Sequence, residues 1–343
     1  MEEQKNQNQI IEDVQAQNAE ETIQNAGAEK SSGFNIGIGT SILISAILIS
    51  GTWVYSVGLK SGTLPKTQNA SVSETTISEL EEKVLPSEGV VLPAVWGDLG
   101  LQLVNSGAID ADKFKSIYEQ RDAFAKEYEN LLLGKNNGKL RITNENSGYL
   151  LNLLWALGLA NKNPILENGE MADPRYGGAE NFASTAGWTI AKGNAMEHYS
   201  KHRLLELTDE QQALVEKVSK GVYRPCCGNS THFPDCNHGM AMLGLLELMA
   251  SQNASEQEMW NAALAVNSYW FPDTYLTIAT YMKNKGIEWE NVDPIEILGA
   301  DYSSASGYRK ISSQTAKTQK SSGGSGCGID SAPAPQQQSG CGI

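Results

Sequence analysis

Cysteine and histidine, the side chains that bind soft and borderline metal ions, are concentrated in one short window of this chain. Seven of the nine cysteines and histidines lie between residues 198 and 238. They are His198, His202, Cys226, Cys227, His232, Cys236 and His238. Thiols and imidazoles also carry acid–base and redox chemistry near neutral pH. The window therefore predicts one chemical site.

The centre of this window is the motif YRPCCGNSTHFPDCNHGM, residues 223–240. It is rich in proline, glycine, asparagine and aspartate, which form turns, so it predicts a compact loop. A helix is expected to begin after the loop, at Asp235 or Asn237. Cys236 and His238 would then lie at a helix N-terminus, where the partial positive charge stabilises a thiolate.

Three cysteines with one or more histidines favour zinc, copper or iron, because soft thiolates select these ions over magnesium and calcium. The primary candidate ligands are Cys226, Cys227, Cys236 and His238. The auxiliary candidates are His232, His198 and His202. Arg224 and Asp235 flank the thiols, and we expect them to orient a ligand or to tune a thiol pKa. A structural disulfide and a set of buried thiols are the alternatives to a metal.

The spacing of the motif excludes several familiar sites. It has neither the C-x2-C pairs of common zinc modules nor the C-x-x-C-H of covalent haem attachment. His198 and His202 lie in EHYSKH, which is not a zinc-peptidase motif. Their segment reads as a helix, and a spacing of four would place both imidazoles on one face. The alternative is a solvated helix face beside Lys201 and Arg203.

Two further cysteines, Cys327 and Cys341, lie in two copies of the pentapeptide SGCGI in a serine- and glycine-rich tail. Such a tail is expected to be flexible, so its thiols could reach the loop and exchange a metal ion or a disulfide with it. Cys341 is followed by two residues, one too few for a prenylation signal. The alternative is that the repeat is incidental.

An uncharged run, Ile36–Val57, is long enough to cross a bilayer, for which about 20 apolar residues suffice. The sequence therefore predicts a single transmembrane helix over residues 36–58, with membrane lipid as a partner. A signal peptide fits less well, because 35 polar residues come first. The predicted location is a single-pass membrane protein whose C-terminal domain is extracytoplasmic. A net charge of −14 argues against nucleic acid as a partner.

The chain is predicted to be all-α: a compact multi-helix globular domain on a single transmembrane helix, with disordered tails. Gly148–Ala160 is apolar almost all round and predicts a central buried helix. Capping boxes begin at Thr208 and Ser255. The best strand signal, Lys139–Thr143, is short. The predicted regions are an acidic tail at 1–35, a linker at 59–74, the helical domain at 75–311 and a flexible tail at 312–343.

Three functions fit this pattern. The first is a membrane-anchored protein that binds, senses or transfers a soft metal, with a metal or thiol exchange partner. The second is a thiol–disulfide oxidoreductase whose tail thiols shuttle electrons. The third is a non-enzymatic helical scaffold with a structural metal or disulfide. A hydrolase is not expected, because the sequence has no nucleophile elbow or paired-carboxylate motif.

Overall fold

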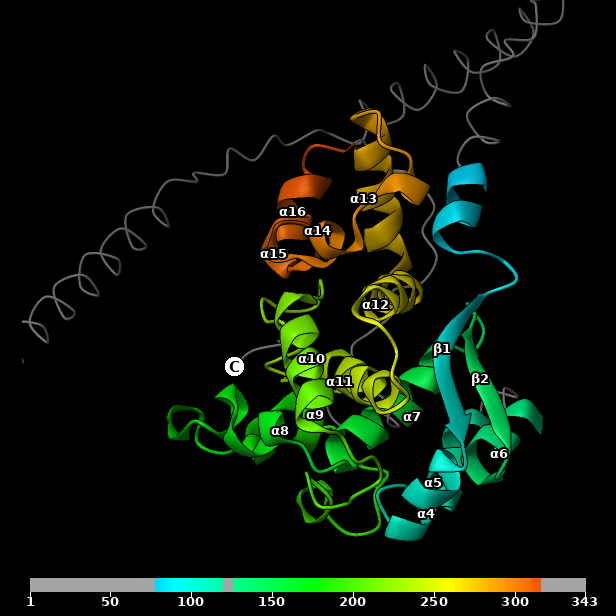
Figure 1. The fold of residues 1–343 in the computed structure, drawn as a ribbon, viewed down its shortest axis with the longest axis vertical. Coiled ribbons are helices and arrows are strands. Elements are labelled where there is room, and N and C mark those ends of the chain that lie inside the picture. The colour runs from blue at the N-terminus through cyan, green and yellow to red at the C-terminus, as the bar shows by residue number, and fades with distance from the viewer. Residues whose placement is uncertain (1–77, 120–125, 316–343) are drawn as a thin grey trace, which may run out of the picture. The chain divides into compact units, whose positions relative to one another are not determined.

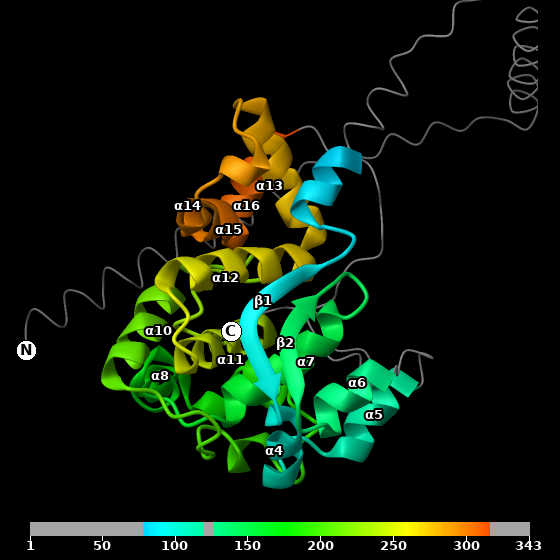
Figure 2. The same ribbon diagram turned by 45° about the vertical axis from the view of Figure 1, so that its right-hand side comes forward.

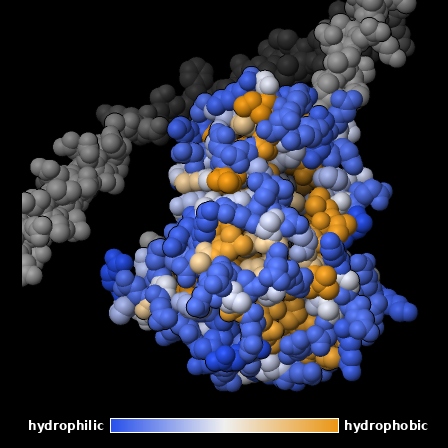
Figure 3. Space-filling view, in the orientation of Figure 1, coloured by the Kyte–Doolittle hydropathy of each residue, from blue (hydrophilic) through white to orange (hydrophobic). Residues whose placement is uncertain are grey.

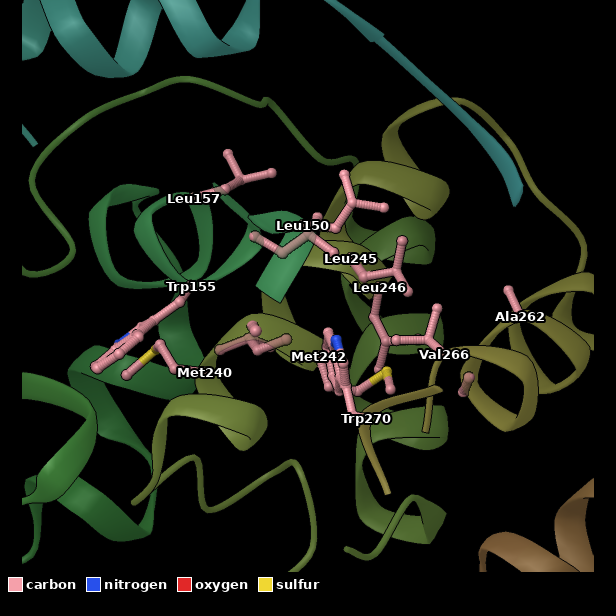
Figure 4. Close-up of a cluster of buried hydrophobic side chains, with 14 of the residues drawn as sticks. Leu150, Trp155, Leu157, Met240, Met242, Leu245, Leu246, Ala262, Val266 and Trp270 are labelled. Atoms are coloured by element: carbon pink, nitrogen blue, oxygen red, sulfur yellow. The ribbon is translucent and has the colours of Figure 1, made fainter. Parts of the chain in front are cut away.

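The computed structural model describes residues 78–119 and 126–315, and two apolar helices form the centre of this part. They are α7 (Ser147–Ala160) and α11 (Asn237–Ser251), which pack along each other. Nearly every residue of both helices is buried, as expected for sequences that are apolar on all sides. Figure 4 shows side chains of this core, contributed by α7, α11 and the next helix, α12 (Glu256–Trp270).

Two glycines allow the backbones of α7 and α11 to touch. A Cβ atom on Gly158 would lie 2.0 Å from the carbonyl oxygen of Met240. A Cβ atom on Gly244 would lie 2.5 Å from the carbonyl oxygen of Leu154. Real Cβ atoms do not approach backbone this closely, so glycine is required at both positions of this helix crossing.

The other helices form three groups (Figures 1 and 2). Residues 78–84 are helical and lead into the first strand. On one side of the core lie α4 (Leu99–Ser106), α5 (Ala111–Glu119) and α6 (Lys126–Leu133). Elsewhere around it lie α8 (Pro164–Asn168), α9 (Ala183–Ala186) and α10 (Asp209–Gly221). The last group, on α12, comprises α13 (Pro272–Asn284), α14 (Pro294–Leu298), α15 (Ala300–Ser303) and α16 (Ala305–Ser312).

The helix starts follow the capping signals in the sequence. The predicted boxes at Thr208 and Ser255 are confirmed: each hydroxyl accepts the backbone N–H three residues on, and that residue's side chain accepts in return. Short 3-10 turns fill the connections. They are η1 (Glu170–Ala172), η2 (Pro174–Tyr176), η3 (Ala179–Asn181), η4 (Ala195–Glu197) and η5 (Trp289–Asn291).

The all-α prediction is wrong, because the structure contains a two-stranded antiparallel sheet. Strand β1 (Val90–Gly97) pairs with β2 (Asn137–Ile142), and Val95 lies opposite Lys139. The predicted strand at Lys139–Thr143 overlaps β2. Along β1 the side chains alternate between the core and solvent, the pattern of a strand with one buried face.

The outer edge of β1 is bonded to a side chain instead of a third strand. The backbone N–H of Val95 donates to Oε1 of Gln252 at 2.8 Å, and Nε2 of Gln252 donates to the Val95 carbonyl at 2.7 Å. The amide of Gln252 thus makes the two hydrogen bonds that a neighbouring strand residue would make.

The prediction of a single-pass membrane protein is corrected. Among residues 78–119 and 126–315, no helix has the length and apolar character needed to cross a bilayer. The predicted segment at 36–58 lies outside the described residues, as do the predicted regions at 1–35 and 59–74. Cys327 and Cys341 lie outside them too.

The visible surface is mainly hydrophilic, with hydrophobic residues in separate patches (Figure 3). The large apolar side chains that are exposed among the described residues are Val91, Val95, Tyr176, Ile287 and Ile295. Val91 and Val95 are on the solvent face of β1. A polar surface fits the strongly negative net charge of −14.

Candidate metal centre

The cysteine motif forms a loop between α10 and α11, as predicted, and elements distant in sequence hold it. The Tyr223 N–H donates to the Leu298 carbonyl at 2.8 Å, and the Ala305 N–H donates to the Cys227 carbonyl at 2.9 Å. The Ser184 N–H donates to the Asp235 carbonyl at 3.0 Å. Residues from α9, α14 and α16 thus fix both ends of the loop.

Helix α11 begins where the loop ends, and its first residues carry two of the candidate ligands. Cys236 is the N-cap, and its sulfur accepts the Gly239 N–H at 3.5 Å. His238 is buried in the first turn. The centroid of its ring lies 4.4 Å from the ring centroid of Phe271 and 5.7 Å from that of Trp270. The aromatic neighbours therefore restrict the orientation of the imidazole.

The loop and the helix start bring metal-binding atoms together in two overlapping groups. Ligand atoms of Cys226, Cys236 and His238 all lie within 4.8 Å of one another. So do those of Cys227, Asp235 and Cys236. None of the three described cysteines forms a disulfide, and the sulfurs of Cys226 and Cys236 are 3.5 Å apart. These five residues lie close enough to hold a metal ion.

Arg224 is in contact with the thiol cluster and is 1% exposed. Its Nε–H donates to the Cys236 sulfur at 3.0 Å, and the guanidinium forms a salt bridge with Asp235. It also donates to the carbonyls of Asn229 and Phe233, each at 3.0 Å. A buried charge is tolerated only when it is paired and hydrogen-bonded in this way.

A glycine makes room for this guanidinium. A Cβ atom on Gly239 would lie 2.5 Å from Cζ of Arg224. The first turn of α11 therefore needs glycine for the arginine to reach Cys236. Gly239 and Arg224 form one structural unit, although they are 15 positions apart in the sequence.

The two groups differ in how many of their members contact the guanidinium of Arg224. Arg224 already contacts Asp235 and Cys236, two members of the Cys227–Asp235–Cys236 group. A metal ion placed there would be close to the guanidinium charge. The group formed by Cys226, Cys236 and His238 shares only Cys236 with the arginine contacts.

The electrostatic environment localises negative charge on Cys236. Hydrogen bonds from Cys226 and Cys227, with the charge of Arg224 and a hydrogen bond to His238, hold its pKa well below the usual range despite burial. For Cys227, the hydrogen bond with Cys226 lowers the pKa, but the bond to Cys236 and burial outweigh it and raise the pKa to about 12. Burial also raises the pKa of Asp235.

The other predicted histidines lie apart from the thiols. Neither group of metal-binding atoms found among the described residues includes His198, His202 or His232. The backbone of His232 donates to the Ser219 carbonyl, and its side chain is half-buried, which lowers the pKa of the imidazole. His232 is therefore a loop residue beside α10.

The helix predicted for the His198–His202 segment is also wrong. Only η4 is helical there, and Ser200 has a positive φ of 52° that breaks helical geometry. The turn still brings the imidazoles together, with His198 Nδ1 3.0 Å from His202 Nε2. Nε2 of His198 donates to the Lys192 carbonyl at 2.8 Å.

A buried acid on α11 was not anticipated. Glu247 is 0% exposed, and burial raises its pKa to about 8. Its Oε2 accepts from Nδ2 of Asn161 at 2.9 Å. The signal in the sequence is a single acidic residue in the apolar run GMAMLGLLELMA. An acid in such a run must be buried in a neutral or hydrogen-bonded form.

Comparisons with known proteins gave no match to a family, a curated protein or a solved structure. The function therefore has to be inferred from the geometry of the loop and α11.

Proposed function

We propose that this protein binds a soft or borderline metal ion through Cys226, Cys236 and His238, and that it holds the ion for exchange. The supporting observation is the cluster itself, whose three ligand atoms lie within 4.8 Å of one another. Two sulfurs and an imidazole nitrogen are typical ligands of zinc, copper and iron in proteins.

The distances suit a tetrahedral ion. With a zinc–sulfur bond of about 2.3 Å, two sulfurs on tetrahedral zinc are about 3.8 Å apart. The observed separation of Cys226 and Cys236 is 3.5 Å, so a small adjustment of either side chain is sufficient. The imidazole of His238 is held nearby against Phe271.

The charge of the site favours a divalent ion, and zinc is the ion that we propose. Two thiolates and a neutral imidazole give a neutral centre with Zn²⁺, whereas Cu⁺ would leave one uncompensated negative charge in a largely buried place. The charge of Arg224 is matched separately by Asp235. Copper and iron are the other outcomes of the test below.

Three protein ligands leave a fourth position, which distinguishes this set from a closed structural zinc site with four. Cys226 is half-buried, so the ion is nearest to solvent on that side. An incoming thiol or other donor could occupy the fourth position, which supports a role in exchange. Cys327 and Cys341 remain our proposed exchange partners on chemical grounds.

Elemental mass spectrometry on the full chain, purified anaerobically, tests this function. We expect about one equivalent of zinc per chain, lost in Cys236→Ser and in His238→Ala and retained in the control Cys227→Ser. Circular dichroism establishes that each variant is folded. Protein without stoichiometric zinc, copper or iron, or a Cys236→Ser variant that is folded and keeps its metal, would contradict the proposal.

A further inference from the structure

Two of the three proposed ligands are sulfurs in contact with each other. The sulfurs of Cys226 and Cys236 are 3.5 Å apart, and a disulfide bond is about 2.05 Å long. A movement of about 1.5 Å would therefore join them. Cys226 is half-buried whereas Cys236 is 8% exposed, so a dissolved reagent reaches Cys226 first.

We propose that Cys226 and Cys236 form a reversible disulfide on contact with a low-molecular-weight disulfide, and that this releases the metal ion. The release step rests on the proposed metal binding, whereas the pairing of the two cysteines does not. A sulfur in a disulfide is no longer a thiolate ligand, so His238 alone would remain of the three ligands. One reaction thus removes two ligands.

The reaction is an ordinary thiol–disulfide exchange. The Cys226 thiolate attacks one sulfur of the reagent RSSR, which forms a Cys226–SR bond and releases RS⁻. The Cys236 thiolate then attacks Cys226 Sγ, which breaks that bond and releases the second RS⁻. The two cysteines lose two electrons, RSSR gains them, and the zinc leaves as Zn²⁺.

The geometry of the chain favours Cys236 over the adjacent Cys227 as the disulfide partner of Cys226. The Cys227 thiol also lies 3.8 Å from Asp235 Oδ1 and 4.0 Å from the Asn229 carbonyl. A bond between Cys226 and Cys227 would close a small ring through adjacent residues and strain the disulfide geometry. A disulfide between Cys226 and Cys236 joins residues that are not adjacent, so it avoids this strain.

The surroundings tolerate the oxidised form. When Cys236 enters a disulfide, Arg224 loses the negative charge of the thiolate but keeps its salt bridge to Asp235. It also keeps the carbonyls of Asn229 and Phe233 as acceptors. The buried guanidinium therefore remains paired, and the loop has no reason to unfold when the metal leaves.

The test uses the full chain, reduced, loaded with zinc and then treated with oxidised glutathione. Zinc release is followed with a chromogenic chelator, and peptide mass spectrometry maps the disulfide after alkylation. We expect a Cys226–Cys236 disulfide and one zinc released per disulfide, with reduction restoring zinc uptake. A Cys227→Ser variant, and a Cys327→Ser/Cys341→Ser variant, should release zinc in the same way.

A disulfide between Cys226 and Cys227 or with a tail cysteine, or no disulfide, would overturn the proposal. So would a Cys226–Cys236 disulfide that forms while zinc stays bound. If the reduced protein takes up no metal, the proposed function fails, and mapping of the metal-free protein still decides which cysteines pair.

Discussion

The positive charge of Arg224 lies wholly inside the protein, and four acceptors use its donors. The turn-forming residues before an apolar run predict a loop and then a helix, which places Cys236 and His238 at the helix start. The depth of Arg224 is not predictable in this way. It depends on segments that meet the loop only in the folded chain, around Ser184, Leu298 and Ala305.

Replacing Arg224 tests how much its buried hydrogen bonds stabilise the folded protein. We expect Arg224→Lys to lower the free energy of unfolding by about 2 kcal/mol, because lysine cannot reproduce the forked hydrogen bonds inside the protein. Urea unfolding measures the change. The matched control is Arg175→Lys, whose exposed ion pair with Asp173 should contribute little. Equal effects of the two variants would contradict the importance of burial.

Glu247 should make the protein less stable as the pH rises. Its pKa is about 8 in the folded chain, against 4.5 for an ordinary glutamate. The folded state therefore keeps a proton that the unfolded state releases, and stability falls from pH 4.5 upward until about pH 8.

The variant Glu247→Gln removes this titration. We expect it to gain stability relative to the natural protein by on the order of 3 kcal/mol between pH 4.5 and pH 7. Urea unfolding at a series of pH values gives the difference. Below pH 4.5 the difference should be constant, which serves as the internal control. Parallel pH profiles would show that Glu247 is charged or exposed.

His202 should make the protein less stable as the pH falls. Burial, with a smaller effect of His198, lowers its pKa below 6.5. The unfolded state then binds the proton more readily, so stability falls as the pH drops below about 6.5. In His202→Gln this loss should be smaller, as thermal melts between pH 5 and pH 7 would reveal. An unchanged profile would assign the acid sensitivity to other groups.

Local sequence predicts the helices of this protein better than its strands. Helices α7 and α11 are recognisable because apolar residues cover every face. The capping boxes indicate where α10 and α12 begin. Strand β1 contains Pro93, and its partner β2 is about 40 residues away, so the pairing is a non-local event. The sequence does not predict the turn at Ser200, because serine rarely has a positive φ.

The crossing of α7 and α11 should be intolerant of a single methyl group. We expect Gly158→Ala to cost about 3 kcal/mol or more, because its Cβ would overlap the Met240 carbonyl. The control is Gly148→Ala in the same helix, which is exposed with open space around it. That change should stabilise the protein by about 0.5–1 kcal/mol, because alanine favours helix. Thermal unfolding distinguishes the two, and a neutral Gly158→Ala would contradict the close contact.

Metal binding should raise the unfolding temperature of the protein. The loop contacts α9, α14 and α16 and continues into α11, so an ion at its centre binds only the folded chain. Free zinc at about 1,000 times its dissociation constant should add about 4 kcal/mol. Differential scanning fluorimetry with zinc or a chelator measures this. The stabilisation should persist in Cys227→Ser and vanish in Cys236→Ser; equal stabilisation of both would place the ion elsewhere.

The amide of Gln252 on the edge of β1 also bears on how copies of this protein behave together. A strand with unpaired backbone groups is a template on which another chain can add a strand and begin to aggregate. Val91 and Val95 make this strand apolar on its solvent face, which increases that hazard. Because Gln252 occupies both backbone groups of Val95, we expect it to prevent another chain from pairing with the middle of this edge.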